Sequence, residues 1–314
     1  MQKVIIYLLF LNVFTSNLLI AQDTVCSETY RTYVYKTEDT TNLLVDVFLP
    51  FDTMKNRTCI LYLHGGGFMG GKRHYYNQFE FYHYFASQGV VVTSMSYRYT
   101  MKDKGFNCRT PAKEKIHAFR EAAIDINDCV DFLLRNATAL GIDSSKIIIA
   151  GSSAGAEACL HAAYMPLKKK DRIGDENFRF AGVISMAGAL ADTSWITREN
   201  AIPTLLFHGT CDKLVPYGAA AHHYCDEKRP GYLMLYGGHS IMERLRHLDR
   251  GYYLYTLCNG GHEISGTPLT KYLPEMMDWI NNDVEKQKLR QIHIIEPTDK
   301  KSCDLPQFSF CNHD

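Results

Sequence analysis

The sequence predicts an α/β fold in a single domain, with a mostly parallel central sheet and helices on both of its faces. Short runs of β-branched and aromatic residues alternate along the chain with helical patterns, an arrangement typical of parallel sheets. The clearest helical pattern covers 119–137, where apolar residues recur at spacings of three and one residues. No internal repeat or long polar linker divides the 314 residues, of which 46% are hydrophobic and 22% are charged.

The expected strands are short and mostly apolar, and polar or glycine-containing turns separate them. They cover residues 31–36, 43–49, 58–63, 90–95, 146–150, 180–186, 203–207 and 252–257. The first two suit an antiparallel start to the sheet. Helices are expected from Pro111 to Gly141, after residue 153 as far as Tyr164, and over 271–284. Residues 289–314 are polar and mixed, so we expect them to form a C-terminal tail.

The N-terminus has the composition of an export signal. Lys3 precedes an apolar stretch over 4–20, and we expect cleavage after Ala21, which makes 1–21 a signal peptide. An uncleaved membrane anchor is the alternative, but Asn12 and Asn17 interrupt the apolar stretch. We therefore expect a secreted or periplasmic protein with no stable membrane insertion once the signal is removed.

Ten cysteines in an exported chain predict disulfide bonds. Cys129 and Cys159 fall on apolar helical faces and are expected to be core thiols. Five others lie in or near loops: Cys211, Cys225, Cys258, Cys303 and Cys311. Although the sequence does not determine the pairing, we expect bridges Cys211–Cys225 and Cys303–Cys311.

The charge balance and the histidines argue against two classes of partner. Lys and Arg total 34, as do Asp and Glu, so no net field favours nucleic acid. His222 and His223 with Cys225 form no recognised ligand spacing, so we expect no metal and no other cofactor.

The residues 146–155 give the strongest indication of chemistry. A β-branched run leads into Gly-Ser-Ser-Ala-Gly, and helix-forming sequence follows. This strand, sharp turn and helix are typical of a nucleophile elbow, in which Gly151 and Gly155 leave room for a strained turn. Ser153 is the predicted nucleophile.

An acyl-transfer serine also needs a base, an orienting carboxylate and donors for the oxyanion. Asp212 follows the strand 203–207, and His262 follows the strand 252–257. Loops after the carboxyl ends of parallel strands meet at one edge of the sheet, so we expect these residues to join Ser153. His64 and His208 also follow strands, but each precedes a glycine and is better placed to shape its loop.

Backbone N–H groups are the expected oxyanion donors. Ala154 directly follows the nucleophile, and three consecutive glycines follow the strand 58–63. Glycines let the backbone approach a substrate closely. We predict that Gly66, Gly67 and Ala154 form the oxyanion hole.

Together these motifs resemble those of known serine hydrolases. The segments 64–68 (His-Gly-Gly-Gly-Phe), 96–99 (Ser-Tyr-Arg-Tyr) and 151–155 resemble the hormone-sensitive-lipase-like carboxylesterases. The segments around Asp212 and His262 look more like prolyl-oligopeptidase-type hydrolases and exported carbohydrate esterases. The resemblance implies the α/β-hydrolase fold, with residues 22–288 as the catalytic domain. Two positions depart from the lipase-like pattern, which usually has Asp at Ser152 and Gly at Ala156.

The function implied is hydrolysis of carboxylic esters by a Ser-His-Asp triad through an acyl-enzyme, without a cofactor. The expected partner is a small-molecule or carbohydrate ester, with the acyl group and the oligomeric state left open. A prolyl-oligopeptidase-like peptidase and a non-catalytic binding protein of the same fold are the alternatives. Substrate choice is expected to depend on 68–84 and 231–250, where Tyr75, Tyr76, Tyr232 and Tyr236 are candidates for stacking.

Overall fold

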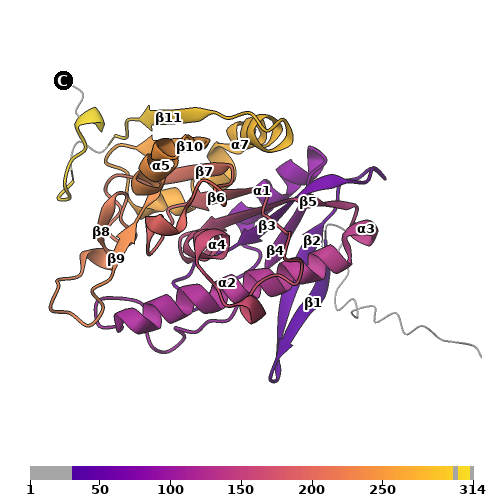
Figure 1. The fold of residues 1–314 in the computed structure, drawn as a ribbon, viewed down its shortest axis with the longest axis horizontal. Coiled ribbons are helices and arrows are strands. Elements are labelled where there is room, and N and C mark those ends of the chain that lie inside the picture. The colour runs from indigo at the N-terminus through magenta and orange to yellow at the C-terminus, as the bar shows by residue number, and fades with distance from the viewer. Residues whose placement is uncertain (1–29, 300–302, 312–314) are drawn as a thin grey trace, which may run out of the picture.

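The computed structural model describes residues 30–299 and 303–311, and its main feature is one nine-stranded sheet (Figure 1). Its strands are β1 (Arg31–Glu38), β2 (Thr41–Phe48), β3 (Arg57–Leu63), β4 (Val91–Met95), β5 (Ile142–Ser152), β6 (Gly182–Met186), β7 (Thr204–Gly209), β10 (Tyr252–Leu257) and β11 (Gln291–Glu296). Their spatial order is β1-β2-β4-β3-β5-β6-β7-β10-β11. The pairs β1–β2 and β2–β4 are antiparallel and the others are parallel, which confirms the predicted fold class.

Helices cover both faces of this sheet because successive side chains of a strand point to opposite sides. On one face Leu61 and Leu63 of β3 share a core with helices α2, α4 and α5. On the other face Ile60 and Tyr62 share a core with α1, α6 and α7. The helices are α1 (Tyr76–Ser87), α2 (Ala112–Arg135), α3 (Ala137–Leu140), α4 (Ala154–Tyr164), α5 (Gly238–His247), α6 (Pro268–Lys271) and α7 (Leu273–Trp279). A two-stranded hairpin of β8 (Ala219–Ala221) and β9 (Met234–Tyr236) completes the fold.

Two parts of the predicted organisation differ from the structure or lie outside it. The predicted tail over 289–314 contains β11, which pairs in parallel with β10 at the edge of the sheet. Its side chains are only half-buried, so its sequence lacks the continuous apolar run of an inner strand. The predicted signal peptide, 1–21, lies outside the described residues. Within 30–299 and 303–311, none of the helices combines the length and apolar character that crossing a bilayer requires.

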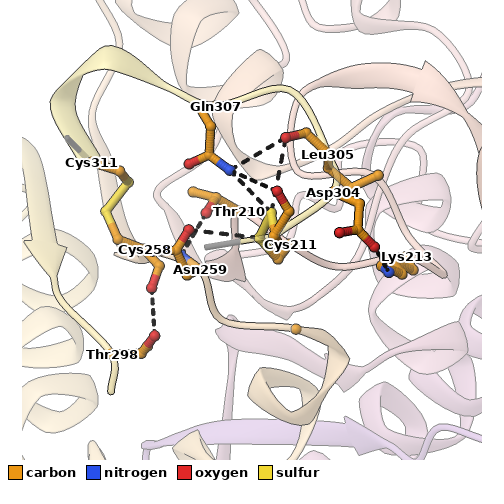
Figure 2. The surroundings of a disulfide bond; sticks show 12 residues. Thr210, Cys211, Lys213, Cys258, Asn259, Thr298, Asp304, Leu305, Gln307 and Cys311 are labelled. Carbon is orange, nitrogen blue, oxygen red and sulfur yellow. Dashed lines mark hydrogen bonds and ion pairs between the residues drawn. A yellow bond between two sulfur atoms is a disulfide. The ribbon is translucent and has the colours of Figure 1, made fainter. Parts of the chain in front are cut away.

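The predicted disulfide pairs Cys211–Cys225 and Cys303–Cys311 are wrong. The C-terminal segment runs back over the loops after β7 and β10, so its two cysteines bond to those loops rather than to each other (Figure 2). The bridges are Cys108–Cys225, Cys211–Cys303 and Cys258–Cys311, with Cα–Cα distances of 5.3, 6.0 and 5.4 Å. Cys129 and Cys159 are buried and unpaired, as predicted for core thiols.

Candidate active site

Ser153 occupies the turn between β5 and α4 in a backbone conformation that few non-glycine residues adopt. Its φ and ψ are 53° and −123°, the strained geometry expected of a nucleophile elbow. A Cβ on Gly151 would collide with the backbone of Gly155, and a Cβ on Gly155 would collide with the carbonyl oxygen of Leu63. The Ser153 N–H donates to the carbonyl oxygen of Met186 at 2.8 Å. The surrounding backbone therefore holds the turn in place from both sides.

Three loops at one edge of the sheet bring Ser153, His262 and Asp212 into a hydrogen-bonded row. Asp212 follows β7, and His262 begins a short 3₁₀ turn after β10. Ser153 Oγ lies 2.7 Å from His262 Nε2, and His262 Nδ1 lies 2.7 Å from Asp212 Oδ2. In this arrangement the imidazole can accept the serine proton while the carboxylate stabilises the resulting imidazolium.

Asp212 is fully buried, and both of its oxygens have partners. Oδ1 accepts from the N–H groups of Leu214 and Val215 at 2.9 and 3.0 Å, while His208 Nε2 lies 3.6 Å from Oδ2. Burial alone would raise the pKa of this carboxyl, but the contacts with His208 and His262 hold the pKa of Asp212 below its ordinary value. Asp212 is therefore anionic and favours the tautomer of His262 that carries its proton on Nδ1.

The three predicted oxyanion donors meet at the same cavity as Ser153. Gly66, Gly67 and Ala154 all line it. Gly66 has a φ of 127°, and a Cβ there would collide with the carbonyl of Gly70, so this loop requires glycine. Among the described residues, no hydrogen-bond acceptor is found for the N–H groups of Gly66, Gly67 or Ala154. These groups are available to a developing negative charge.

His64 holds the glycine loop from behind. Its Nδ1 donates to the carbonyl oxygen of Gly65 at 2.7 Å, and its Nε2 lies 3.2 Å from the Tyr99 hydroxyl oxygen. Tyr97 donates its hydroxyl to the His64 carbonyl at 2.9 Å and stacks on the imidazole ring. Burial lowers the pKa of His64 to about 4, so the ring is neutral. His64 thus shapes the loop rather than taking part in proton transfer.

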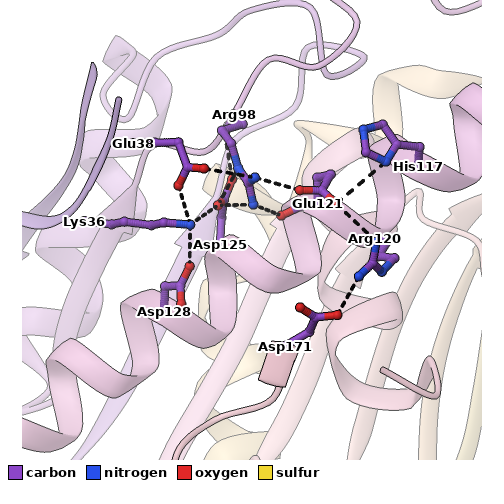
Figure 3. A network of polar contacts seen from close by, with 9 residues as sticks. All are labelled: Lys36, Glu38, Arg98, His117, Arg120, Glu121, Asp125, Asp128 and Asp171. Carbon is purple, nitrogen blue, oxygen red and sulfur yellow. Dashed lines mark hydrogen bonds and ion pairs between the residues drawn. The ribbon is translucent and has the colours of Figure 1, made fainter. Parts of the chain in front are cut away.

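Arg98, between these two tyrosines, anchors their segment to helix α2. Its Nε donates to Asp125 Oδ1 at 2.8 Å, and its Nη1 donates to Glu121 at 2.6 Å. Figure 3 shows these acidic side chains of α2 converging with Arg98 and with Lys36 of β1. Because the Asp125 side chain is completely buried, this ion-pair network fixes the segment that supports the glycine loop.

The cavity beside Ser153 has a volume of about 390 Å³. Met69, Phe106 and Leu214 supply apolar walls, and the polar side chains of Glu157 and His222 also reach it. The predicted substrate segments 68–84 and 231–250 contribute only Met69 to this lining. The candidates Tyr75, Tyr232 and Tyr236 do not line the cavity, and the side chain of Tyr76 lies outside the described part of the structure.

Several residues at the site were not predicted from the sequence. Glu157, four residues after the nucleophile, is an isolated acid in a helix of small and apolar residues, and this isolation was the available signal. His208 was predicted only to shape its loop, yet it also contacts Asp212. Ser152, where the lipase-like pattern has Asp, donates its hydroxyl to the carbonyl oxygen of Ser265 in the His262 turn. Within 30–299 and 303–311, no group of three His, Cys, Asp or Glu side chains forms a possible metal site.

The disulfide bonds are attached to the loops that form this site. Cys211 precedes Asp212 and bonds to Cys303, and Cys258 lies four residues before His262 and bonds to Cys311 (Figure 2). The third bridge, from Cys108 to Cys225, joins two segments to each other. One of them contributes Phe106 to the lining of the cavity, and the other contributes His222.

Comparisons with known proteins relate the chain to esterases. Residues 45–191 match the family described as BD-FAE. A segment of 116 residues is 30% identical to "Cholinesterase 2" of Branchiostoma lanceolatum, and it covers 36% of this chain and 32% of that protein. The chain therefore spans about a third of the length of this curated relative.

Solved structures of an esterase have the same fold. One is esterase 2 of Thermogutta terrifontis phosphorylated by paraoxon, and another is the same esterase with butyrate bound. Each has a TM-score of 0.59 and 18% sequence identity, covering 81% of this chain and 94% of that chain.

Proposed function

We infer that this chain, which has the α/β-hydrolase fold and resembles serine esterases, hydrolyses carboxylic esters with Ser153 as its nucleophile. The observation that carries the proposal is the row Ser153–His262–Asp212, whose two contacts are both 2.7 Å. The esterase structures and the cholinesterase segment support the same class of reaction.

The proposed reaction has two steps. In the first, Ser153 Oγ attacks the ester carbonyl carbon while His262 Nε2 takes its proton, and Asp212 stabilises the imidazolium. The oxyanion accepts hydrogen bonds from Ala154 and from the Gly66–Gly67 loop, and the alcohol leaves with the proton from His262. In the second step, water gives a proton to His262 and attacks the acyl carbon. The bond from that carbon to Ser153 Oγ then breaks, His262 returns the proton to Ser153 Oγ, and the acid is released.

A serine replacement tests this assignment. Ser153→Ala is expected to lower kcat on p-nitrophenyl acetate by several orders of magnitude and to abolish labelling by a fluorophosphonate probe. Ser87→Ala, a matched change at an exposed serine on α1, is expected to retain both. Full activity in Ser153→Ala would refute the proposal. Assays of the wild type on aminoacyl anilides, run in parallel, would identify a peptidase if those substrates were preferred to esters.

For the substrate, we propose an acetyl or another short acyl ester of a carbohydrate. The cavity of about 390 Å³ suits a small acyl group, and its polar wall suits a hydroxylated partner. A screen of the mature chain against acetylated sugars, feruloyl esters and long-chain acyl esters tests this choice. Preferential cleavage of long-chain acyl esters would contradict it.

We also propose that the protein is exported after removal of residues 1–21. Among residues 30–299 and 303–311, six of the nine cysteines form disulfides, which persist in oxidising compartments such as the periplasm or the extracellular space. N-terminal sequencing of the protein recovered after export is expected to begin at Gln22. Recovery of a chain that begins at Met1 would contradict the cleavage.

A further inference from the structure

Glu157 is a buried acid beside the nucleophile that the proposed reaction does not use. It lies in the first turn of α4, is 1% exposed and lines the Ser153 cavity. Its Oε1 atom has no hydrogen-bond partner among the described residues. A buried polar atom left unpaired is costly, so its persistence in a binding cavity indicates that a ligand satisfies it.

His222 faces the same place with a second unsatisfied atom. It is 1% exposed, its Nε2 lies 3.7 Å from Glu157 Oε1, and its Nδ1 has no partner in the described part of the chain. The following residues, His223 and Tyr224, both have positive φ values, of 58° and 50°. Such strain is retained where surrounding structure enforces it, and here Cys225 is bonded to Cys108 directly after the turn.

Burial favours the uncharged forms of both Glu157 and His222. Burial, helped by the negative charge of Asp212, raises the pKa of Glu157 well above its ordinary value, whereas Lys115 opposes this shift. Burial also lowers the pKa of His222 well below its ordinary value. A protonated carboxyl offers one donor and acceptor capacity, and a neutral imidazole offers one donor and one acceptor. An uncharged ligand group that both donates and accepts matches this set, and an alcohol hydroxyl is such a group.

We propose that Glu157 and His222 form a polar subsite of the Ser153 cavity that recognises a hydroxyl group on the acyl or alcohol part of the substrate. The proposal rests on the ester hydrolysis proposed above and specifies its substrate class. An apolar substituent in this position would leave both residues unpaired. An anionic substituent would be repelled by the nearby Asp212, and a cationic substituent would be repelled by the nearby Lys115.

Isosteric pairs of esters test the subsite. Propyl acetate and 2-hydroxyethyl acetate differ on the alcohol part, and methyl butyrate and methyl 3-hydroxypropanoate differ on the acyl part. In at least one pair we expect the wild-type kcat/KM to favour the hydroxylated ester by about tenfold. Glu157→Met should reduce that ratio to about one, whereas Glu157→Gln should retain most of it because an amide still donates and accepts. Glu80→Met, at an exposed position, serves as the matched control and should leave the ratio unchanged.

Three kinetic results would overturn the subsite. They are equal wild-type rates within both pairs, an unchanged ratio in Glu157→Met, and a preference for acetylcholine over 3,3-dimethylbutyl acetate that both variants lose. The first requires no variant and holds even if Glu157→Met does not fold. Ligand-observed NMR on Ser153→Ala compares binding of the same pairs without turnover. A hydroxyl preference there supports the subsite even if ester hydrolysis itself is refuted, and equal binding overturns it.

Discussion

Removing the disulfide between Cys108 and Cys225 is expected to impair ester hydrolysis beyond what its effect on stability explains. The change is Cys108→Ser combined with Cys225→Ser, so that no unpaired thiol remains. The matched control is Cys211→Ser combined with Cys303→Ser. The two bridges close loops of similar length, with sequence separations of 117 and 92 residues.

Their similar lengths make the expected losses of stability nearly equal. The chain-entropy relation gives about 5 kcal/mol of unfolding free energy for each bridge, with a difference of about 0.2 kcal/mol between them. The two bridges differ in what else holds the attached loop. The Asp212 loop keeps its hydrogen bonds to Leu214 and Val215, and the N–H of Cys211 donates to the carbonyl oxygen of Gly260 at 2.8 Å. The positive φ values of His223 and Tyr224 carry strain of about 1–3 kcal/mol each, which a freed loop can relax.

Relaxation of that strain would move His222 and His223 away from the cavity. We therefore expect kcat/KM on the preferred ester to fall at least tenfold in the Cys108–Cys225 variant and less than threefold in the control. Urea unfolding gives the stability of each protein, and the kinetics are measured well below both unfolding temperatures, so that all molecules are folded. Equal losses of kcat/KM in the two variants, or none in the first, would refute the reasoning.

Three further changes test the triad, its support and a buried lysine. Asp212→Asn is expected to lower kcat about 10³- to 10⁴-fold, as in other triads, because the amide no longer selects the reactive tautomer of His262. A loss below tenfold in steady-state assays would contradict this role. Arg98→Met leaves the Asp125 carboxylate buried without its main partner, so the free energy of unfolding in urea should fall by about 3–5 kcal/mol. Adding Asp125→Leu should recover part of this loss, and additive losses would contradict the coupling. Burial lowers the pKa of Lys115 from 10.5 to about 8, so the unfolded chain binds more protons between these values. The stability of the wild type relative to Lys115→Met should therefore rise from pH 8 to 10.5, by at most about 3 kcal/mol, and parallel pH profiles in urea unfolding would exclude this shift.

The meeting of Ser153, His262 and Asp212 could be predicted because it follows from strand order. Ser153, Asp212 and His262 each lie in the turn or loop that follows an apolar run recognisable as a strand. Parallel strands bring such positions to one edge, so approximate strand boundaries were sufficient. The glycine loop could be predicted for the same reason, since it follows β3.

Features that depend on contacts between distant segments could not be predicted in this way. The pairing of Cys211 with Cys303 depends on the return of the C-terminal segment over the sheet edge. The sequence of β11, Gln-Ile-His-Ile-Ile-Glu, lacks the continuous apolar run that identified the inner strands. The burial of Glu157 depends on the loop that carries His222. An acid in a helix is usually solvated, and its sequence neighbours do not show what covers it.

The disulfide bonds restrain the loops of the site rather than the core of the fold. Two apolar cores, one on each face of the sheet, already hold the strands and helices together. The bridges from Cys108, Cys211 and Cys258 instead attach to loops beyond the strand ends, where regular backbone pairing stops. Acyl transfer depends on groups held at hydrogen-bond distance before the substrate arrives, and a displacement of about 1 Å can cost about 10²-fold in rate. Covalent links on these loops therefore act where the sheet cannot, which is why loss of a bridge should change kcat/KM according to the loop it restrains rather than the stability it contributes.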